Sequence, residues 1–271
     1  MSNSSKITLI FPISGTVEHS GYKYKPFRKI GEETFIEKAV KPFLNHSKSI
    51  KTIVFVALEE HEKQYNVSDG LKSFFPKLNY QLITISKPTR GPAETAIRAI
   101  NTIPITGPIM ICDSDHSIDV DPLFKLISEN HELKCLLPIW RFNGQNVKDW
   151  SVVSVTDSEM VTGIAEKQLP ETPGEFFGVI GCYYFSEVQI FSQYKDSTYI
   201  SDTVSKMIEA RISVHTVKIE NAEFFGSKKR LIKTLSKHQI HAGTIFCDMD
   251  GTIVAHEDIP TYDHPLEVLP G

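Results

Sequence analysis

Apolar and polar positions follow two different periods along the first half of the chain. Short runs rich in β-branched residues, such as Ile50 to Leu58 and Ile109 to Cys112, indicate buried strands. Between such runs, apolar residues recur every three or four positions, as in Thr34 to Leu44, which indicates amphipathic helices. We expect strands at 7–13, 50–58, 80–86 and 109–112, and helices at 34–44, 67–75, 92–101 and from about Asp121 onward. Strands that alternate with helices predict a mostly parallel sheet.

The pattern becomes richer in strands in the second half. We expect strands at 134–142, 150–156, 161–166, 178–185 and 214–219, and helices at 201–212 and 228–237. A shift in composition around 238–243 indicates a linker. The sequence therefore predicts one α/β domain over residues 6–237 and a separate segment over residues 238–271.

The first candidate site lies at the end of the predicted strand 109–112, where Asp113 and Asp115 follow directly. Open α/β sheets bind ligands beyond the carboxyl ends of their strands. Two carboxylates one residue apart can share a hard divalent cation that bridges to phosphate oxygens. The alternative is a loop of capping acids that precedes the helix near Asp121.

A basic segment precedes the first predicted helix. Val17 to Ile30 has no helical period and carries Lys23, Lys25, Arg28 and Lys29. Such a loop could fold over phosphate groups, or it could be a solvated surface loop.

Composition and charge exclude several classes of protein. A net charge of −4, without a long cluster of Lys and Arg, gives no support for a nucleic-acid partner. No apolar run approaches the ~18 residues of a membrane span, and the polar first residues do not resemble a signal peptide. The widely spaced cysteines indicate buried thiols in a reducing compartment. They are Cys112, Cys135, Cys182 and Cys247. We expect a cytoplasmic protein without nucleic-acid or membrane partners, compatible with a homo-oligomer.

Five short motifs occur in order along the chain. They are Ser14-Gly15 followed by Lys25-Pro26, the stretch Thr89 to Ala96, Asp113-Ser114-Asp115-His116, Glu166-Lys167, and Gly178 to Phe185. Together they resemble the motifs of the sugar-phosphate nucleotidyltransferases, or pyrophosphorylases, over nearly all of residues 7–235. The resemblance implies a three-layer α/β/α, Rossmann-like fold of the glycosyltransferase-A type. Its sheet would be mixed and mostly parallel, with a nucleotide-binding half and a β-rich acceptor-binding half.

The resemblance also implies a reaction. A phosphate oxygen of a sugar phosphate or related phospho-compound attacks the α-phosphorus of a nucleoside triphosphate, and pyrophosphate leaves; such products would serve surface polysaccharide synthesis. Two polyanions must be held in line, so the site needs cations more than a base. The implied catalytic groups are Mg²⁺ on Asp115 with Asp113, Lys25 at the triphosphate and Lys167 at the attacking phosphate. The implied nucleotide-binding residues are Ser14, Gly15, Lys25, Arg90, Gly91, Thr95 and Asp113. The implied acceptor-binding residues are Glu166, Lys167 and Gly181.

Two features of the resembling family are absent from this sequence. The Gly-x-Gly-x-Arg loop is replaced by Gly15-Thr16-Val17-Glu18-His19, which has no arginine. The family also has a second metal-binding aspartate late in the domain. In the corresponding segment of this sequence, Ala222 to Lys228, Glu223 is the only residue that could serve as a ligand. Two alternatives therefore stay open. One is a glycosyltransferase of the same fold that uses a nucleotide-sugar, although Lys25-Pro26 and Glu166-Lys167 fit pyrophosphorylases better. The other is a catalytically degenerate binding or regulatory domain.

The tail carries a further motif, in which the apolar run from Thr244 leads into Asp248-Met249-Asp250-Gly251-Thr252. This segment resembles the first motif of haloacid-dehalogenase phosphatases, with Asp248 as nucleophile and Asp250 as general acid and base. Only 21 residues follow Asp250, whereas such a domain needs further motifs on later strands. We therefore interpret residues 238–271 as a linker and an incomplete piece of such a domain, and expect no phosphatase activity.

Overall fold

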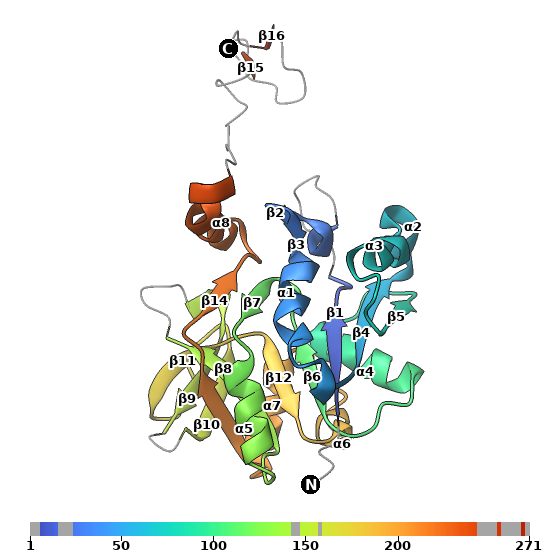
Figure 1. The fold of residues 1–271 in the computed structure, drawn as a ribbon. Helices are drawn as coiled ribbons and strands as arrows, with labels where there is room; N and C mark the ends of the chain where they lie inside the picture. Colours follow the sequence, from blue (N-terminus) through green and yellow to red (C-terminus); the bar gives the residue numbers. More distant parts are fainter. Residues whose placement is uncertain are drawn as a thin grey trace.

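A mixed β-sheet forms the centre of the molecule (Figure 1). The computed structural model describes residues 6–15, 24–141, 147–156, 159–242, 254–255 and 267–268. Within these residues, ten strands form one sheet in the order β10-β9-β11-β8-β12-β6-β1-β4-β5, with β13 paired to β8 outside this path. The parallel part consists of β1 (Ile7–Pro12), β4 (Ile50–Leu58), β5 (Tyr80–Ile85) and β6 (Ile109–Cys112).

Antiparallel pairing extends the sheet beyond β6. The strands there are β8 (Cys135–Trp140), β9 (Ser151–Val155), β10 (Val161–Glu166), β11 (Glu175–Val179), β12 (Cys182–Phe185) and β13 (Val214–Lys218). All neighbouring pairs among them are antiparallel except β13 with β8, which is parallel. The parallel core and this antiparallel extension confirm the predicted division into two halves.

Helices cover both faces of the sheet because side chains alternate along each strand. On β1, Leu9 and Phe11 share one core with α1 (Phe35–Leu44), α3 (Val67–Phe74) and α5 (Asp121–Glu129). Ile10 faces the opposite core, which includes α4 (Pro92–Thr102), α6 (Val188–Ser192) and α7 (Ile200–Glu209). A further helix, α2 (Glu59–Tyr65), follows β4. The three-layer α/β/α arrangement predicted from the sequence is confirmed.

A separate group of elements lies at the carboxyl ends of the parallel strands (Figure 1). It contains the short pair β2 (Lys29–Ile30) and β3 (Glu33–Thr34), the pair β7 (His116–Ile118) and β14 (Ala222–Phe224), and α8 (Lys228–Ala242). A third apolar cluster of Ile30, Phe35, Phe225 and Leu235 joins α8 to this group. The Asp113–Asp115 loop lies between β6 and β7, so these elements surround it.

Two sequence-based expectations need correction. The predicted strand 178–185 is divided into β11 and β12, because at the break between them the carbonyl of Gly181 turns to accept the N–H of Asp113 at 2.7 Å. The predicted linker over 238–243 is helical as far as Ala242, since α8 continues beyond Lys237. The division into 6–237 and 238–271 otherwise stays a prediction, and Asp248 and Asp250 lie outside the described residues.

The described cysteines agree with the prediction of buried thiols. Cys112, Cys135 and Cys182 are buried free thiols, whereas Cys247 lies outside the described residues. Of the helices in the described part of the chain, none has the length and apolar character to cross a bilayer. The pattern did not reveal α2, α6, β7 or β14, which are too short to show a period.

The start of α1 yields a stability prediction. The hydroxyl of Thr34 accepts the N–H of Glu37 at 3.3 Å, and the carboxylate of Glu37 accepts the N–H of Thr34 at 2.7 Å. Thr34→Ala should lower the free energy of unfolding by ~1–2 kcal/mol through loss of this cap. Thr34→Ser, which keeps the hydroxyl, should lose less, and Ser73→Ala on the exposed face of α3 should change little. Denaturant unfolding measures all three; equal losses in Thr34→Ala and Thr34→Ser would show that the cap contributes nothing.

Candidate functional site

The backbone holds Asp113 and Asp115 in place from two sides. β6 is completely buried, and Asp113 is the first residue after it. Its N–H donates to Gly181 between β11 and β12, and the carbonyl of Asp115 accepts the N–H of Phe225 at 3.0 Å, just after β14. The break in the antiparallel half and the segment after β14, in its separate two-stranded sheet, thus fix a loop that the parallel half produces.

Two glycines leave room for the carboxylates. A Cβ on Gly181 would lie 1.9 Å from Asp113 Oδ2, and a Cβ on Gly226 would lie 2.2 Å from Asp115 Oδ2. Any other residue at either position would displace a carboxylate. The structure therefore gives Gly181, predicted to contact the acceptor, a direct role beside Asp113.

Lys25 forms an ion pair with Asp115. Its Nζ lies 2.7 Å from Asp115 Oδ2. Lys25 opens the short 3-10 helix η1 (Lys25–Phe27), and the preceding Tyr24 is buried, donates its hydroxyl to the Ile13 carbonyl and stacks on Tyr65. This anchor fixes the backbone from which Lys25 reaches Asp115.

The two carboxyl groups differ in their electrostatic environment. Burial raises the pKa of Asp113 to about 7, and the Asp115 and Glu166 carboxylates add to this effect, against the pull of Lys25. Burial also acts to raise the pKa of Asp115, but Lys25, with smaller contributions from His116 and Arg230, holds it below its ordinary value. One ammonium group therefore compensates one of two neighbouring acids, and Asp113 carries the remaining repulsion.

The donor set fits a divalent cation. Asp113, Asp115 and His116 each offer one ligand atom, and these atoms lie within 4.8 Å of one another. Burial lowers the pKa of His116 to about 4, so its ring is neutral at neutral pH. Carboxylate oxygens are the ligands that Mg²⁺ prefers, and the uncompensated charge at Asp113 is what such an ion would neutralise.

A cavity of about 270 Å³ opens beside these groups. It is lined by Pro12, Ile13, Gly15, Lys25, Pro26, Asp113, Ser114 and Asp115. The predicted nucleotide-binding residues Gly15, Lys25 and Asp113 therefore share one cavity at the carboxyl ends of β1 and β6.

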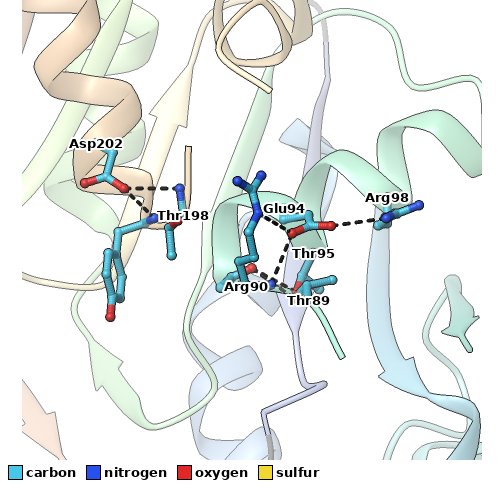
Figure 2. A network of polar contacts seen from close by, with 9 residues as sticks. Thr89, Arg90, Glu94, Thr95, Arg98, Thr198 and Asp202 are labelled. Carbon is cyan, nitrogen blue, oxygen red and sulfur yellow. Dashed lines mark hydrogen bonds and ion pairs between the residues drawn. The ribbon is translucent and has the colours of Figure 1, made fainter. Parts of the chain in front are cut away.

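The other predicted nucleotide-binding residues form a network at the start of α4 (Figure 2). The Thr95 hydroxyl lies 3.2 Å from that of Ser14 and 2.6 Å from that of Thr89. Arg90 is not directed at the aspartates, because its Nε donates to Glu94 at 2.9 Å. The Arg90 guanidinium is the main reason that the pKa of Glu94 falls to about 2.

Gly91 allows α4 to approach the turn before α7. The carbonyl of Thr198 accepts the Ala93 N–H at 3.2 Å, and a Cβ on Gly91 would meet this oxygen at 2.5 Å. Asp202 in turn accepts the N–H of Thr198 at 3.1 Å, as Figure 2 shows.

The predicted acceptor-binding pair lies at the end of β10. The carboxylate of Glu166 accepts the hydroxyls of Ser151 and Ser201, the latter at 2.8 Å. The backbone turns at Lys167, whose φ is 58°, and its ammonium lies 5.5 Å from the centre of the Tyr199 ring. Glu166 and Lys167 therefore point to different partners.

Glu223 lies apart from the aspartate group. Its carboxylate pairs with Lys38 at 3.4 Å, and the ligand-like cluster of Asp113, Asp115 and His116 does not include it. Arg230, on α8, is not among the site residues predicted from the sequence. The Arg230 guanidinium lies 3.8 Å from the centre of the Trp150 ring, donates to the Asp149 carbonyl at 2.7 Å, and contributes to the low pKa of Asp115. Only the three-dimensional position of α8 reveals this, because the sequence shows no more than a basic run.

Comparison with solved structures identifies the fold. A nucleoside-diphosphate-sugar pyrophosphorylase from Vibrio cholerae is similar with a TM-score of 0.67 and 19% identity, covering 84% of this chain and 99% of that one. A UDP-glucose pyrophosphorylase complexed with UDP-glucose gives 0.69 and 15%, covering 87% and 99%. A UTP-bound UGPase from Acinetobacter baumannii gives 0.66 and 14%, covering 87% and 94%. No protein-family model and no curated protein matches the sequence. The chain thus has the mixed α/β fold, with a parallel core, of nucleotidyltransferase structures.

The raised pKa of Asp113 predicts how stability depends on pH in metal-free solution. The ordinary pKa of 3.8 describes the unfolded chain, whereas the folded carboxyl keeps its proton to about pH 7. Between these values the folded state binds more protons than the unfolded state, so the contribution of Asp113 to stability falls as the pH rises through this window. Asp113→Asn should remove the loss and raise the free energy of unfolding at about pH 8 by ~1–3 kcal/mol.

Denaturant unfolding at about pH 5 and about pH 8 measures this effect. Asp196→Asn, at an exposed aspartate in the turn after α6, is the matched control and should show no such gain. An Asp113→Asn variant that is no more stable at the higher pH would contradict the electrostatic description of the site.

Proposed function

We propose that this chain is a Mg²⁺-dependent nucleotidyltransferase. It would transfer a nucleoside monophosphate from a nucleoside triphosphate to a phosphorylated small molecule, and release pyrophosphate. The observation that carries the proposal is the pair of aspartates after β6, with Lys25 bound to Asp115, beside a cavity at the carboxyl ends of the parallel strands. Open α/β sheets bind their ligands at this edge.

Asp113 and Asp115 would hold Mg²⁺, with His116 beside them. Bound there, the ion would supply neutralising charge for the phosphate that undergoes substitution. The support from this chain is the donor set within 4.8 Å and the electrostatic repulsion at Asp113, which a bound cation would relieve.

Lys25 and Lys167 would hold the two anionic reactants. Because Lys25 pairs with Asp115 here, its ammonium can turn to the triphosphate once Asp115 has another cation. Lys167, at the end of β10, would contact the acceptor phosphate, and Glu166 could accept a hydroxyl of the acceptor in place of a serine hydroxyl. Ser14, Gly15, Arg90, Gly91 and Thr95 would border the nucleotide.

The chemistry then requires alignment rather than proton removal. An anionic oxygen of the acceptor phosphate forms a bond to the α-phosphorus, and the bond from that phosphorus to the oxygen bridging to the β-phosphate breaks. The electron pair leaves with pyrophosphate, so no general base is needed. Solved structures of the same fold that contain UTP or UDP-glucose are consistent with such reactants.

Two parts of the sequence-based hypothesis extend this proposal. The acceptor would be a sugar phosphate or phospho-alcohol for surface polysaccharide synthesis. The segment around Asp248 and Asp250 would be a haloacid-dehalogenase-like piece without activity of its own, and no family-model match supports that assignment.

A pyrophosphate-release screen tests the proposed reaction. The four common nucleoside triphosphates would be combined with a panel of phospho-sugars and phospho-alcohols, with and without Mg²⁺. We expect one pair of substrates to give Mg²⁺-dependent pyrophosphate release. Release of nucleoside diphosphate from a nucleotide-sugar would instead support the glycosyltransferase alternative, and no turnover with any pair would support the degenerate domain.

Asp115→Asn should abolish most of the activity found in that screen. Loss of an electrostatic group aimed at the reacting phosphate should cost at least ~2.7 kcal/mol, roughly a hundredfold in rate. The fold should stay intact, because Asp115 lies in a loop beyond the strand. Asp196→Asn is the control for loss of one negative charge, and wild-type rates in Asp115→Asn would exclude the metal assignment.

Lys25→Ala should weaken triphosphate binding by ~1–3 kcal/mol, the range of a charge-assisted hydrogen bond. Lys29→Ala removes the same charge from an exposed position on β2 and should have a smaller effect. Calorimetry at one fixed Mg²⁺ concentration compares the two variants. Equal losses would mean that only the general positive charge of this segment matters.

A further inference from the structure

A second cavity, which we call the α8 pocket, lies beneath α8 and beside β14. Its volume is about 370 Å³, and none of its lining residues lines the cavity at Asp113 and Asp115. Its lining includes two aromatic and four basic residues, namely Trp140, Phe224, Lys229, Arg230, Lys233 and Lys237. The pocket is therefore a site of its own, separate from the proposed catalytic one.

Unpaired positive charge lies along one wall of the α8 pocket. Lys229, Lys233 and Lys237 recur every four residues, so they lie along one face of α8. Within the described part of the chain, none of these lysines forms an ion pair. Two of the three acids in the wall are already engaged, since Glu223 pairs with Lys38 at 3.4 Å and Asp149 lies 4.0 Å from Arg230. With the third, Glu220, the lining carries four basic side chains and three acidic ones, so one positive charge is in excess.

Two aromatic residues, Trp140 and Phe224, also line the pocket, and both pack against Trp150. Trp140 and Trp150 have ring centres 4.7 Å apart, and Phe224 lies 4.8 Å from each of them. The guanidinium of Arg230 covers the Trp150 ring. The pocket thus offers an apolar surface beside a row of cations.

Three buried donors of the tryptophans and Arg230 lack acceptors. The Nε1–H groups of Trp140 and Trp150 and the Nε–H of Arg230 have no hydrogen-bond partner within the described residues. Trp140 and Arg230 line the pocket, so the group that their N–H donors lack there is an acceptor oxygen.

We propose that the α8 pocket binds a small phosphorylated molecule with an apolar face. Phosphate oxygens would accept hydrogen bonds from Lys229 and Lys233, and the apolar part would lie against Trp140 and Phe224. The volume is in the range of small-molecule sites, and the concave shape does not suit a nucleic-acid duplex or a membrane surface. The proposal is independent of the nucleotidyltransferase reaction, since the pocket contains none of its groups.

The tryptophans provide a local readout, because Trp140 and Trp150 are the two tryptophans of the whole chain. Phenyl phosphate would be titrated into the protein in metal-free buffer while intrinsic tryptophan fluorescence is recorded. We expect a saturable change, with weaker responses to inorganic phosphate and to benzyl alcohol alone. Lys229→Gln/Lys233→Gln should weaken binding at least ~10-fold through loss of two charge-assisted contacts.

Two further variants locate the binding. Lys63→Gln/Lys72→Gln removes two exposed lysines from α2 and α3 and should bind like the wild type. Asp115→Asn should also bind like the wild type, because Asp115 does not line the α8 pocket. Circular dichroism would show that all variants are folded. The absence of a saturable change, equal weakening by both lysine pairs, or a change that depends on Asp115 but not on Lys229 and Lys233 would each overturn the proposal.

Discussion

The unequal charge balance between Asp113, Asp115 and Lys25 is the constraint on which the site depends. Two carboxylates lie close together beyond a buried strand, and one ammonium at 2.7 Å compensates only Asp115. Burial and the neighbouring carboxylates raise the pKa of Asp113, so the fold holds an acid where its ionised form is disfavoured. Such an arrangement costs stability, and strongly shifted pKa values of this kind are typical of functional sites, here one that a cation would complete. The glycines at 181 and 226 keep the carboxylates close, since any Cβ there would push one of them away.

The two halves of the sheet contribute different parts of this arrangement. The parallel strands produce the loops at one edge, with Gly15 after β1 and the aspartates after β6. The antiparallel half limits where those loops can go through the break between β11 and β12, and the separate two-stranded pair β7–β14 adds a second constraint. α8 then closes the side of the site near Asp115 and places Arg230 within electrostatic range of it. Glu166, the last residue of β10, and Lys167 after it lie at the far end of the sheet order, and both are proposed to contact the acceptor.

The sequence predicted the parts of the molecule that depend on local pattern. The runs Ile50 to Leu58, buried on both faces from Ile53 onward, and Ile109 to Cys112 indicate central strands by their composition alone, and their bounds agree with β4 and β6. That Asp113 and Asp115 lie close together also follows from their spacing in the sequence. Most interaction partners of the predicted site residues could not be predicted in this way, because they depend on contacts between distant segments. Glu223 pairs with Lys38, and Arg230 on α8 lies within electrostatic range of Asp115. Arg90, by contrast, binds a near neighbour, Glu94 in the first turn of α4. The break at Gly181 was equally invisible, since an apolar run does not show where its backbone leaves the sheet.

A crystal structure with Mn²⁺ and a non-hydrolysable nucleoside triphosphate tests the central claim most directly, because the anomalous signal of Mn²⁺ locates the metal independently of activity. The account predicts an anomalous peak bound by the carboxylates of Asp113 and Asp115. It also predicts that the ammonium of Lys25 has moved from Asp115 to a phosphate oxygen. A triphosphate bound elsewhere, or no metal peak and Lys25 still paired with Asp115, would contradict it.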